Sequence, residues 1–274
     1  MSQFRFGGFN MLPDVVKNLL IINGLFFLAT MVLESSFGID LTGKLALYYF
    51  DSDKFKPYQF VSHLFMHGSF WHLFSNMFAL WMFGNALENV WGPKKFLTFY
   101  LVTGLGAAAL HSAITAYEVF NLSAACSAYA NNPSIEAFHE FIKTHLPAYL
   151  KSSYMNFLDE WMNTPTSGEY ARESVKAVQK IMELKQDVPT VGASGAVFGV
   201  LLGYGMLFPN TVIYLNFLFP VKAKYFVLFY GLFELYAGVQ SFEGDNIAHF
   251  AHLGGMIFGF FLIRYWRTQK TNFL

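Results

Sequence analysis

Residues 191–209, which read VGASGAVFGVLLGYGMLFP, decide the fold of this chain. The stretch carries no charged side chain, and about 20 apolar residues are what a helix needs to cross a bilayer. Gly195, Gly199 and Gly203 recur every four residues, a spacing that lets membrane helices pack closely. Ser194 stands just before them. The stretch therefore predicts a membrane-spanning helix with a hydroxyl near one end.

The composition of the whole chain also indicates a lipid environment. Hydrophobic residues make up 54% of the 274 residues and charged residues only 13%, whereas soluble domains carry about a quarter charged residues. The formal net charge is zero, so nothing favours a nucleic acid as partner. Cys126 is the single cysteine, which excludes an internal disulfide. We expect lipid to be the main solvent of the folded chain.

Apolar segments of suitable length predict an all-α polytopic protein with a bundle of six transmembrane helices. The predicted spans are approximately residues 15–33, 70–87, 96–117, 191–209, 225–239 and 247–266. Lysines and arginines gather in the short segments on one side of these spans, which by the positive-inside rule places both termini in the cytoplasm. The polar start of the chain predicts no removable signal peptide. We expect a multi-pass protein of the bacterial cytoplasmic (inner) membrane.

A long polar insert separates the third and fourth spans. Within it, residues 134–144, 149–162 and 169–184 show the helical period. The predicted organisation is spans 1–3 in residues 1–117, an extracytoplasmic helical insert in 118–189, and spans 4–6 in 190–274. The insert can be interpreted as a cap on the outer surface, or as a gate or docking element.

Polar side chains inside the predicted spans are costly in lipid and are functional hypotheses by default. His72 and Asn76 on the second span, Ser194 on the fourth and His252 on the sixth all fall roughly 3–9 Å from the outer boundary, at 1.5 Å per residue. Each alone has a structural interpretation, such as a serine bonded to its own backbone. Their common depth favours a single functional layer.

The fourth and sixth spans are predicted to approach closely. Gly255 and Gly259 repeat every four residues on the sixth span, and His252 lies one helical turn before Gly255. This register selects His252 over His249, which lies one turn closer to water. The spacing brings an imidazole towards the Ser194 hydroxyl, as an activated serine nucleophile requires.

Three motifs in this order resemble those of rhomboid proteases. Gly192-Ala193-Ser194-Gly195 resembles their GxSG motif, and His72–Asn76 resembles their HxxxN motif. In the last span of these proteases a histidine is followed by glycines three and seven residues later, as His252 is followed here by Gly255 and Gly259. The resemblance implies an intramembrane serine endopeptidase with a Ser194–His252 dyad, cleaving single-span transmembrane substrates near the outer leaflet. It also implies that His72, Asn76 and the turn at Gly192 hold the oxyanion, without a metal or other cofactor.

Some residues depart from the family pattern. Phe198, one turn after Ser194, stands where similar proteases often have a tyrosine stacked on the histidine, so we expect stacking without a hydroxyl. Pro57-Tyr58-Gln59 replaces a frequent Trp-Arg pair in the loop after the first span, and the insert is absent from the simplest members. No acid is evident as a third catalytic group, because Glu234 is expected nearer the middle or the cytoplasmic half and is interpreted as structural.

Two other functions remain as alternatives. A catalytically silent rhomboid-like chaperone or binding protein would typically lack the serine or the histidine, and both are present. A metal or haem protein would use a set of histidines, here His63, His67, His72, His111, His249 and His252, but all six are expected towards one face of the membrane.

Overall fold

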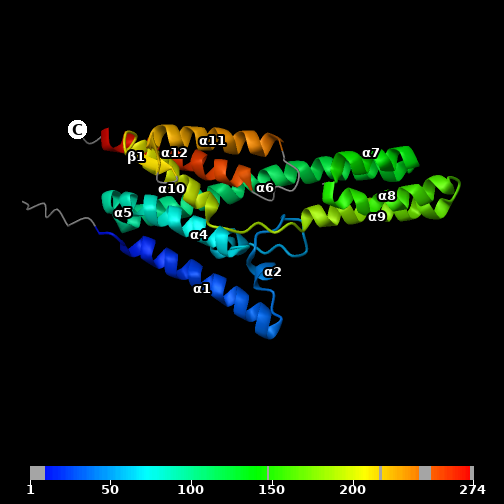
Figure 1. Cartoon of the computed structure of the whole chain (residues 1–274), viewed down its shortest axis with the longest axis horizontal. Helices are drawn as coiled ribbons and strands as arrows, with labels where there is room; N and C mark the ends of the chain where they lie inside the picture. Colours follow the sequence, from blue (N-terminus) through cyan, green and yellow to red (C-terminus); the bar gives the residue numbers. More distant parts are fainter. Residues whose placement is uncertain (1–9, 147, 216–217, 241–247, 272–274) are drawn as a thin grey trace, which may run out of the picture.

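The computed structural model describes residues 10–146, 148–215, 218–240 and 248–271, and is built almost wholly of helices along one long axis (Figure 1). One end holds a bundle made of α1 (Asp14–Phe37), α4 (Phe70–Ala79), α5 (Asn85–Trp91), α6 (Pro93–Asn131), α10 (Ser194–Leu207), α11 (Ala223–Gln240) and α12 (His249–Thr271). At the end away from the C-terminus lie α7 (Ile135–His145), α8 (Ala148–Asn163) and α9 (Gly168–Gln186). The predicted start of the sixth span, residue 247, lies outside the described residues.

The predicted second span is a helix with a change of pitch in its middle. A π-helical turn, η2 (Leu80–Gly84), joins α4 to α5, and such turns are frequent near functional sites. The Ser69 hydroxyl accepts a hydrogen bond from the backbone N–H of His72 at 3.1 Å, so α4 has a regular N-cap immediately before the HxxxN residues. The cap fixes where α4 starts and therefore how its first turn is oriented.

Within the described residues, α1 and α6 are long and apolar enough to cross a membrane by themselves, while α10 has 14 residues. With 39 residues, α6 is about 58 Å long at 1.5 Å per residue, well beyond the roughly 30 Å of a hydrocarbon core. The helix that contains the third span therefore continues without a break past residue 117 to Asn131. The predicted span, residues 96–117, thus covers only part of this helix, because apolar residues continue at helical spacing after residue 117.

A separate hydrophobic core holds the insert together. The last turns of α6 contribute Leu122 and Tyr129, which pack against residues such as Phe138 of α7, Trp161 of α8 and Val178 of α9. Tyr129 also shares a buried hydrogen bond with Ser174 of α9. The three helices expected from the sequence are present with nearly the predicted bounds, and α6 supplies the fourth wall of their core.

The core of the main bundle lies between α6, α10 and α12, close to η2. Its fully buried members include Leu80, Phe96, Phe99, Tyr100 and Val200. By contrast, apolar side chains of α1 and α11 are exposed, as expected of faces that meet lipid rather than water. The only described strands, β1 (Val212–Leu215) and β2 (Phe219–Lys222), pair antiparallel between α10 and α11, so this hairpin is a small departure from the all-α prediction.

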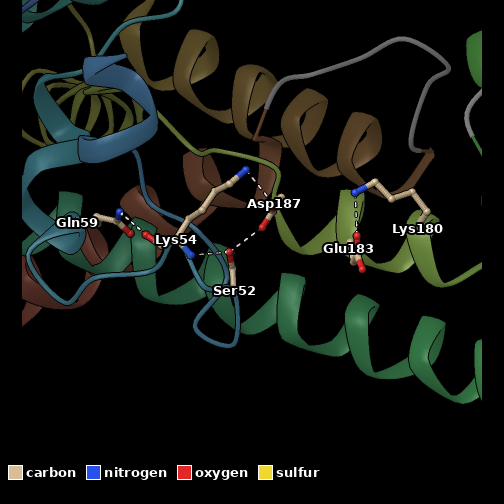
Figure 2. Close-up of polar contacts among 6 residues, drawn as sticks. All are labelled: Ser52, Lys54, Gln59, Lys180, Glu183 and Asp187. Atoms are coloured by element: carbon tan, nitrogen blue, oxygen red, sulfur yellow. Dashed lines mark hydrogen bonds and ion pairs between the residues drawn. The ribbon is translucent and has the colours of Figure 1, made fainter. Parts of the chain in front are cut away.

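A polar junction ties the loop after α1 to the end of the insert (Figure 2). Asp187, just after α9, accepts a hydrogen bond from the Ser52 hydroxyl at 2.7 Å and pairs with the Lys54 ammonium at 2.8 Å. Gln59 is fully buried, and its amide donates to the backbone carbonyl of Lys54 at 3.0 Å. Tyr58 is exposed beside it. The residues that replace the family's Trp-Arg pair thus anchor this loop to the fold.

We expect Asp187→Asn to lower the thermal unfolding midpoint at neutral pH and to lower it less at pH 3. The hydrogen bonds and charge of Lys54 and Ser52 lower the pKa of Asp187 from its ordinary value of 3.8. Its stabilisation is therefore present above that value and is lost as the pH falls through the lower folded-state pKa. Because the pair is partly exposed, the loss is below about 1 kcal/mol.

The measurement is thermal unfolding in detergent at pH 7 and at pH 3. Asp159→Asn, at an exposed position of α8, is the matched control and should leave the midpoint unchanged at both values. If the Asp187→Asn midpoint lies below the wild-type midpoint by the same amount at pH 7 and at pH 3, the carboxylate charge does not contribute to stability.

Candidate active site

Ser194 is the first residue of α10 and follows a turn that only glycine can form. Gly192 has φ of +121°, a conformation that other residues rarely adopt. A Cβ atom built on Gly192 would lie 2.8 Å from two ring atoms of His72 and 3.7 Å from the Ser194 hydroxyl. The turn therefore brings His72 and Ser194 to the same small space, as the sequence predicted.

The segment before this turn is held from both sides. Thr190 and Leu47 exchange backbone hydrogen bonds at 2.8 and 2.9 Å, and the N–H of Gly192 donates to the carbonyl of His63 at 2.9 Å. The Thr190 hydroxyl also bonds to His111 on α6 at 2.9 Å. These contacts link the end of the insert to the bundle and fix the position from which α10 presents Ser194.

His252 on α12 reaches Ser194 directly. Its Nε2 lies 2.9 Å from the Ser194 hydroxyl oxygen, within hydrogen-bond distance. The helices can come this close because a Cβ atom on Gly255 would lie only 1.8 Å from the carbonyl oxygen of Gly195. The predicted approach of these two helices through glycine is confirmed at this crossing.

The rest of the glycine repeat on α10 has a different neighbour. A Cβ atom on Gly199 would meet Thr103 of α6 at 2.5 Å, and one on Gly203 would meet Leu87 of α5 at 3.1 Å. The glycine repeat therefore packs α10 against α6 and α5, while other residues of α10, such as Leu202, also contact α12. The spacing alone could not tell which neighbour each glycine meets.

Phe198 and His252 form the stacked pair expected from the sequence. Their ring centroids are 4.0 Å apart and their planes differ by 6°. On its other side Phe198 contacts Tyr230 of α11, with centroids 4.9 Å apart. The imidazole is thus held against a flat apolar surface, which restricts its ring orientation without offering a hydrogen bond.

Glu234 on α11 is the site residue that the sequence interpretation missed. Its carboxylate oxygen Oε2 lies 2.8 Å from Nδ1 of His252 and 2.6 Å from Nδ1 of His249. All three side chains are buried, so His249 is part of the interior rather than of the surface. The expectation that no acid lies near the histidine is wrong.

The error came from judging the depth of Glu234. It lies six residues before the end of α11, about 9 Å along the axis, while His252 lies three residues into α12, about 4.5 Å. The two positions therefore lie at similar depths in the bundle. A buried acid in an otherwise apolar helix was the signal, because such a charge needs partners.

Glu234, His249 and His252 also offer one carboxylate oxygen and two imidazole nitrogens within 4.8 Å of one another, a set that could hold a metal ion. The same atoms are accounted for by hydrogen bonds, since each Nδ1–H can donate to the shared oxygen. His63 and His111 are bonded elsewhere, to a backbone carbonyl and to a threonine hydroxyl. Among the described histidines, His249 and His252 therefore share one centre with Glu234, while His63 and His111 have other partners.

Asn76 lies one turn after His72 on the same face of α4. It is buried, and its side-chain Nδ2 has no hydrogen-bond partner among the described residues. Buried donors are normally satisfied, so a free one at a reactive site needs an explanation. His67, which sequence reasoning did not select for this site, packs its ring against His72 with centroids 5.1 Å apart.

Curated relatives of the chain carry rhomboid names. Rhomboid protein 1, mitochondrial, of Saccharomyces cerevisiae is 27% identical over 199 residues, covering 73% of this chain and 39% of the relative. RHOMBOID-like protein 12, mitochondrial, of Arabidopsis thaliana is 25% identical over 244 residues, covering 88% and 55%. An uncharacterized mitochondrial rhomboid protein of Schizosaccharomyces pombe is 25% identical over 217 residues, covering 77% and 52%.

The chain thus spans about half the length, or less, of the relatives it matches. All three are named as mitochondrial. This finding contradicts the expected location in a bacterial cytoplasmic membrane, together with the cytoplasmic termini that went with it. Membranes of different origin impose the same apolar patterns, so composition and span count could not distinguish them.

The relatives and the helical architecture agree with a match to a known family. The protein has an all-helical membrane fold, apart from the short hairpin. The family model described as the Rhomboid domain matches residues 54–159 and 161–268, well over half of the sequence, and the chain therefore belongs to the rhomboid family.

Proposed function

We propose that this chain is an intramembrane serine endopeptidase in which Ser194 is the nucleophile and His252 the general base. The observation that carries the proposal is the 2.9 Å separation between the Ser194 hydroxyl oxygen and Nε2 of His252. A nucleophile needs an adjacent base at this distance, and the base needs a third group or surface that orients it. Phe198 supplies such a surface by stacking on the imidazole.

The reaction follows from this geometry. Nε2 of His252 takes the proton of the Ser194 hydroxyl as its oxygen attacks the scissile carbonyl carbon. The imidazolium then gives that proton to the leaving amine, and an acyl-enzyme remains. Water, deprotonated by the same imidazole, attacks the acyl carbon and releases the acid product, returning Ser194 to its starting form.

The oxyanion of the tetrahedral intermediate would be held at the space in front of Gly192. The donors we propose are the Ser194 backbone N–H at the start of α10, the His72 ring, which lies beside Gly192, and Nδ2 of Asn76, which has no partner among the described residues. Donors that are positioned in advance act strongly where water is scarce. The absence of a side chain at Gly192 leaves room for the substrate carbonyl.

The substrates we propose are single-span transmembrane proteins, cleaved near the outer leaflet. Six spans would form the catalytic bundle within segments 1–117 and 190–274, and residues 118–189 would form a helical insert on the outer side. The bilayer itself is the other partner, and the names of the relatives favour a mitochondrial membrane.

A serine-directed fluorophosphonate probe tests the proposal. We expect the detergent-solubilised or reconstituted wild-type chain to be labelled at Ser194, as located by mass spectrometry of peptides, and Ser194→Ala to remain unlabelled. Cleavage of a model transmembrane substrate should be lost in the same variant. If wild type and Ser194→Ala were equally inert towards the probe and many substrates, the chain would instead be a binding protein or chaperone.

Asn76→Ala is expected to lower kcat for a transmembrane substrate by about 10²- to 10³-fold with little change in KM, the usual loss when one oxyanion donor is removed. The loss falls on kcat because the donor acts on charge that develops only in the transition state. Steady-state cleavage in proteoliposomes measures both constants. Asn23→Ala, a buried asparagine of α1 that bonds its own helix, is the matched control and should retain wild-type kcat.

A further inference from the structure

The carboxylate of Glu234 lies between two histidines of the neighbouring helix. His249 and His252 are three residues apart on α12 and therefore share a helix face. Their Nδ1 atoms lie 2.6 and 2.8 Å from one oxygen of Glu234, whose side chain is only 4% exposed. Glu234 thus connects α11 to α12 through Nδ1 of His252, while Nε2 of the same ring faces Ser194.

These contacts determine the tautomer of His252. An ionised carboxylate only accepts hydrogen bonds, so Nδ1 of His252 must carry the proton that faces Glu234. In neutral imidazole the proton on Nδ1 leaves Nε2 free to accept, and Nε2 is the atom that lies 2.9 Å from the Ser194 hydroxyl. The opposite tautomer would place a proton on Nε2 and could not take one from serine.

Building on the proposed function, we propose that Glu234 is a positioning residue that completes a Ser194–His252–Glu234 relay and separates this chain from a simple two-residue dyad. Its carboxylate holds His252 in the tautomer that can accept the serine proton. It also places a negative charge beside the imidazole when that ring takes up the proton. No proton moves to Glu234 in either step.

His249 has a distinct part in the same arrangement. A buried carboxylate is costly unless hydrogen bonds satisfy it. The second Nδ1–H, from His249, supplies such a bond and fixes the direction of the carboxylate. Because His249 lies one turn closer to the start of α12, it holds Glu234 without occupying the face of His252 that meets Ser194.

Glu234→Gln tests the proposal, because glutamine keeps the shape and loses the charge and the acceptor-only character. We expect kcat for a transmembrane substrate and the rate of fluorophosphonate labelling at Ser194 to fall by about 10²- to 10⁴-fold, with KM within about twofold. A side chain that merely filled space would leave both rates unchanged. The labelling rate constant is read on folded protein and does not depend on how much of it folds.

Glu234→Asp separates charge from shape. Aspartate changes the shape more but keeps an acceptor-only carboxylate, so we expect it to retain more labelling activity than Glu234→Gln. Glu88→Gln is the matched control, since Glu88 is a buried carboxylate that accepts bonds from the N–H groups of Val15 and Val16 at the start of α1. It should leave the labelling rate within about twofold of wild type.

The outcomes distinguish this proposal from the proposed function. An unlabelled wild type would reject the serine protease itself. If the wild type is labelled and Glu234→Gln is labelled at the same rate, the role of Glu234 is rejected while the serine protease stands. The same conclusion follows if Glu234→Gln is labelled faster than Glu234→Asp. Loss of wild-type labelling in a chelator, restored by Zn²⁺, would also reject it and assign Glu234, His249 and His252 to a metal.

Discussion

Replacing His252 with alanine is expected to lower kcat by about 10⁵- to 10⁶-fold for a transmembrane substrate, to the level left by oxyanion stabilisation and binding alone. A serine hydroxyl is a weak nucleophile, and in this chain the nitrogen that can take its proton lies 2.9 Å away. Without that nitrogen the hydroxyl would have to lose its proton to scarce water. Single-turnover cleavage in proteoliposomes measures the loss.

A second histidine variant controls for general effects of the substitution. His139 lies exposed on α7, in the insert and away from the site layer, so His139→Ala should cleave at the wild-type rate. The double variant Ser194→Ala/His252→Ala should be no slower than either single variant, because the two groups act as a unit. Full activity of His252→Ala would remove His252 as the base.

The contact between Ser194 and His252 could be predicted from the sequence because their positions carry depth information. Ser194 and His252 both lie near the N-terminal ends of their helices, and Gly255 marks the face of α12 that meets α10. Counting residues at a fixed rise gives depth to within about a turn. That accuracy was sufficient to predict that the Ser194 hydroxyl and the His252 imidazole lie at the same depth.

Glu234 escaped prediction because depth alone does not define a helix face. α11 does carry Gly231 and Gly238, where a Cβ atom would meet side chains of α12 at 3.0 and 3.2 Å, but this spacing was not used to fix the rotation of the helix. The depth of Glu234 was also misjudged, because it lies only five residues before the predicted end of the span at residue 239. Only the packing of α11 on α12 shows that the carboxylate points to Nδ1 of His252. Its two histidine partners explain how an acid can be buried there.

The length of α6 shows a second limit of the sequence. Hydropathy marks where lipid contact ends, near residue 117, but helix propensity and packing decide where the helix ends. Leu122 and Tyr129 continue the apolar stripe of α6, and α7–α9 cover it to form the core of the insert. One continuous helix thus joins the membrane bundle to the insert at a place where the composition of the sequence predicts a domain boundary.

Gly255→Ala is expected to destabilise the bundle by about 3 kcal/mol or more, the upper part of the range for overpacking a core. The added Cβ would lie 1.8 Å from the carbonyl oxygen of Gly195, and a backbone atom cannot move aside as a flexible side chain can. α12 must therefore shift from α10, which carries His252 away from Ser194. A displacement near 1 Å at reacting groups costs about 10²-fold in rate.

Thermal unfolding in detergent should therefore show a midpoint lower by about 6–12 °C, at roughly 2–4 °C per kcal/mol for a chain of this size. Gly24→Ala is the matched control, because Gly24 lies inside α1 and a Cβ atom there would meet nothing within 4 Å. Alanine favours a helix over glycine by about 1 kcal/mol, so this variant should be as stable as wild type or slightly more so. If Gly255→Ala instead kept both the wild-type midpoint and the wild-type cleavage rate, the backbone contact between α10 and α12 would not be what holds serine and histidine together.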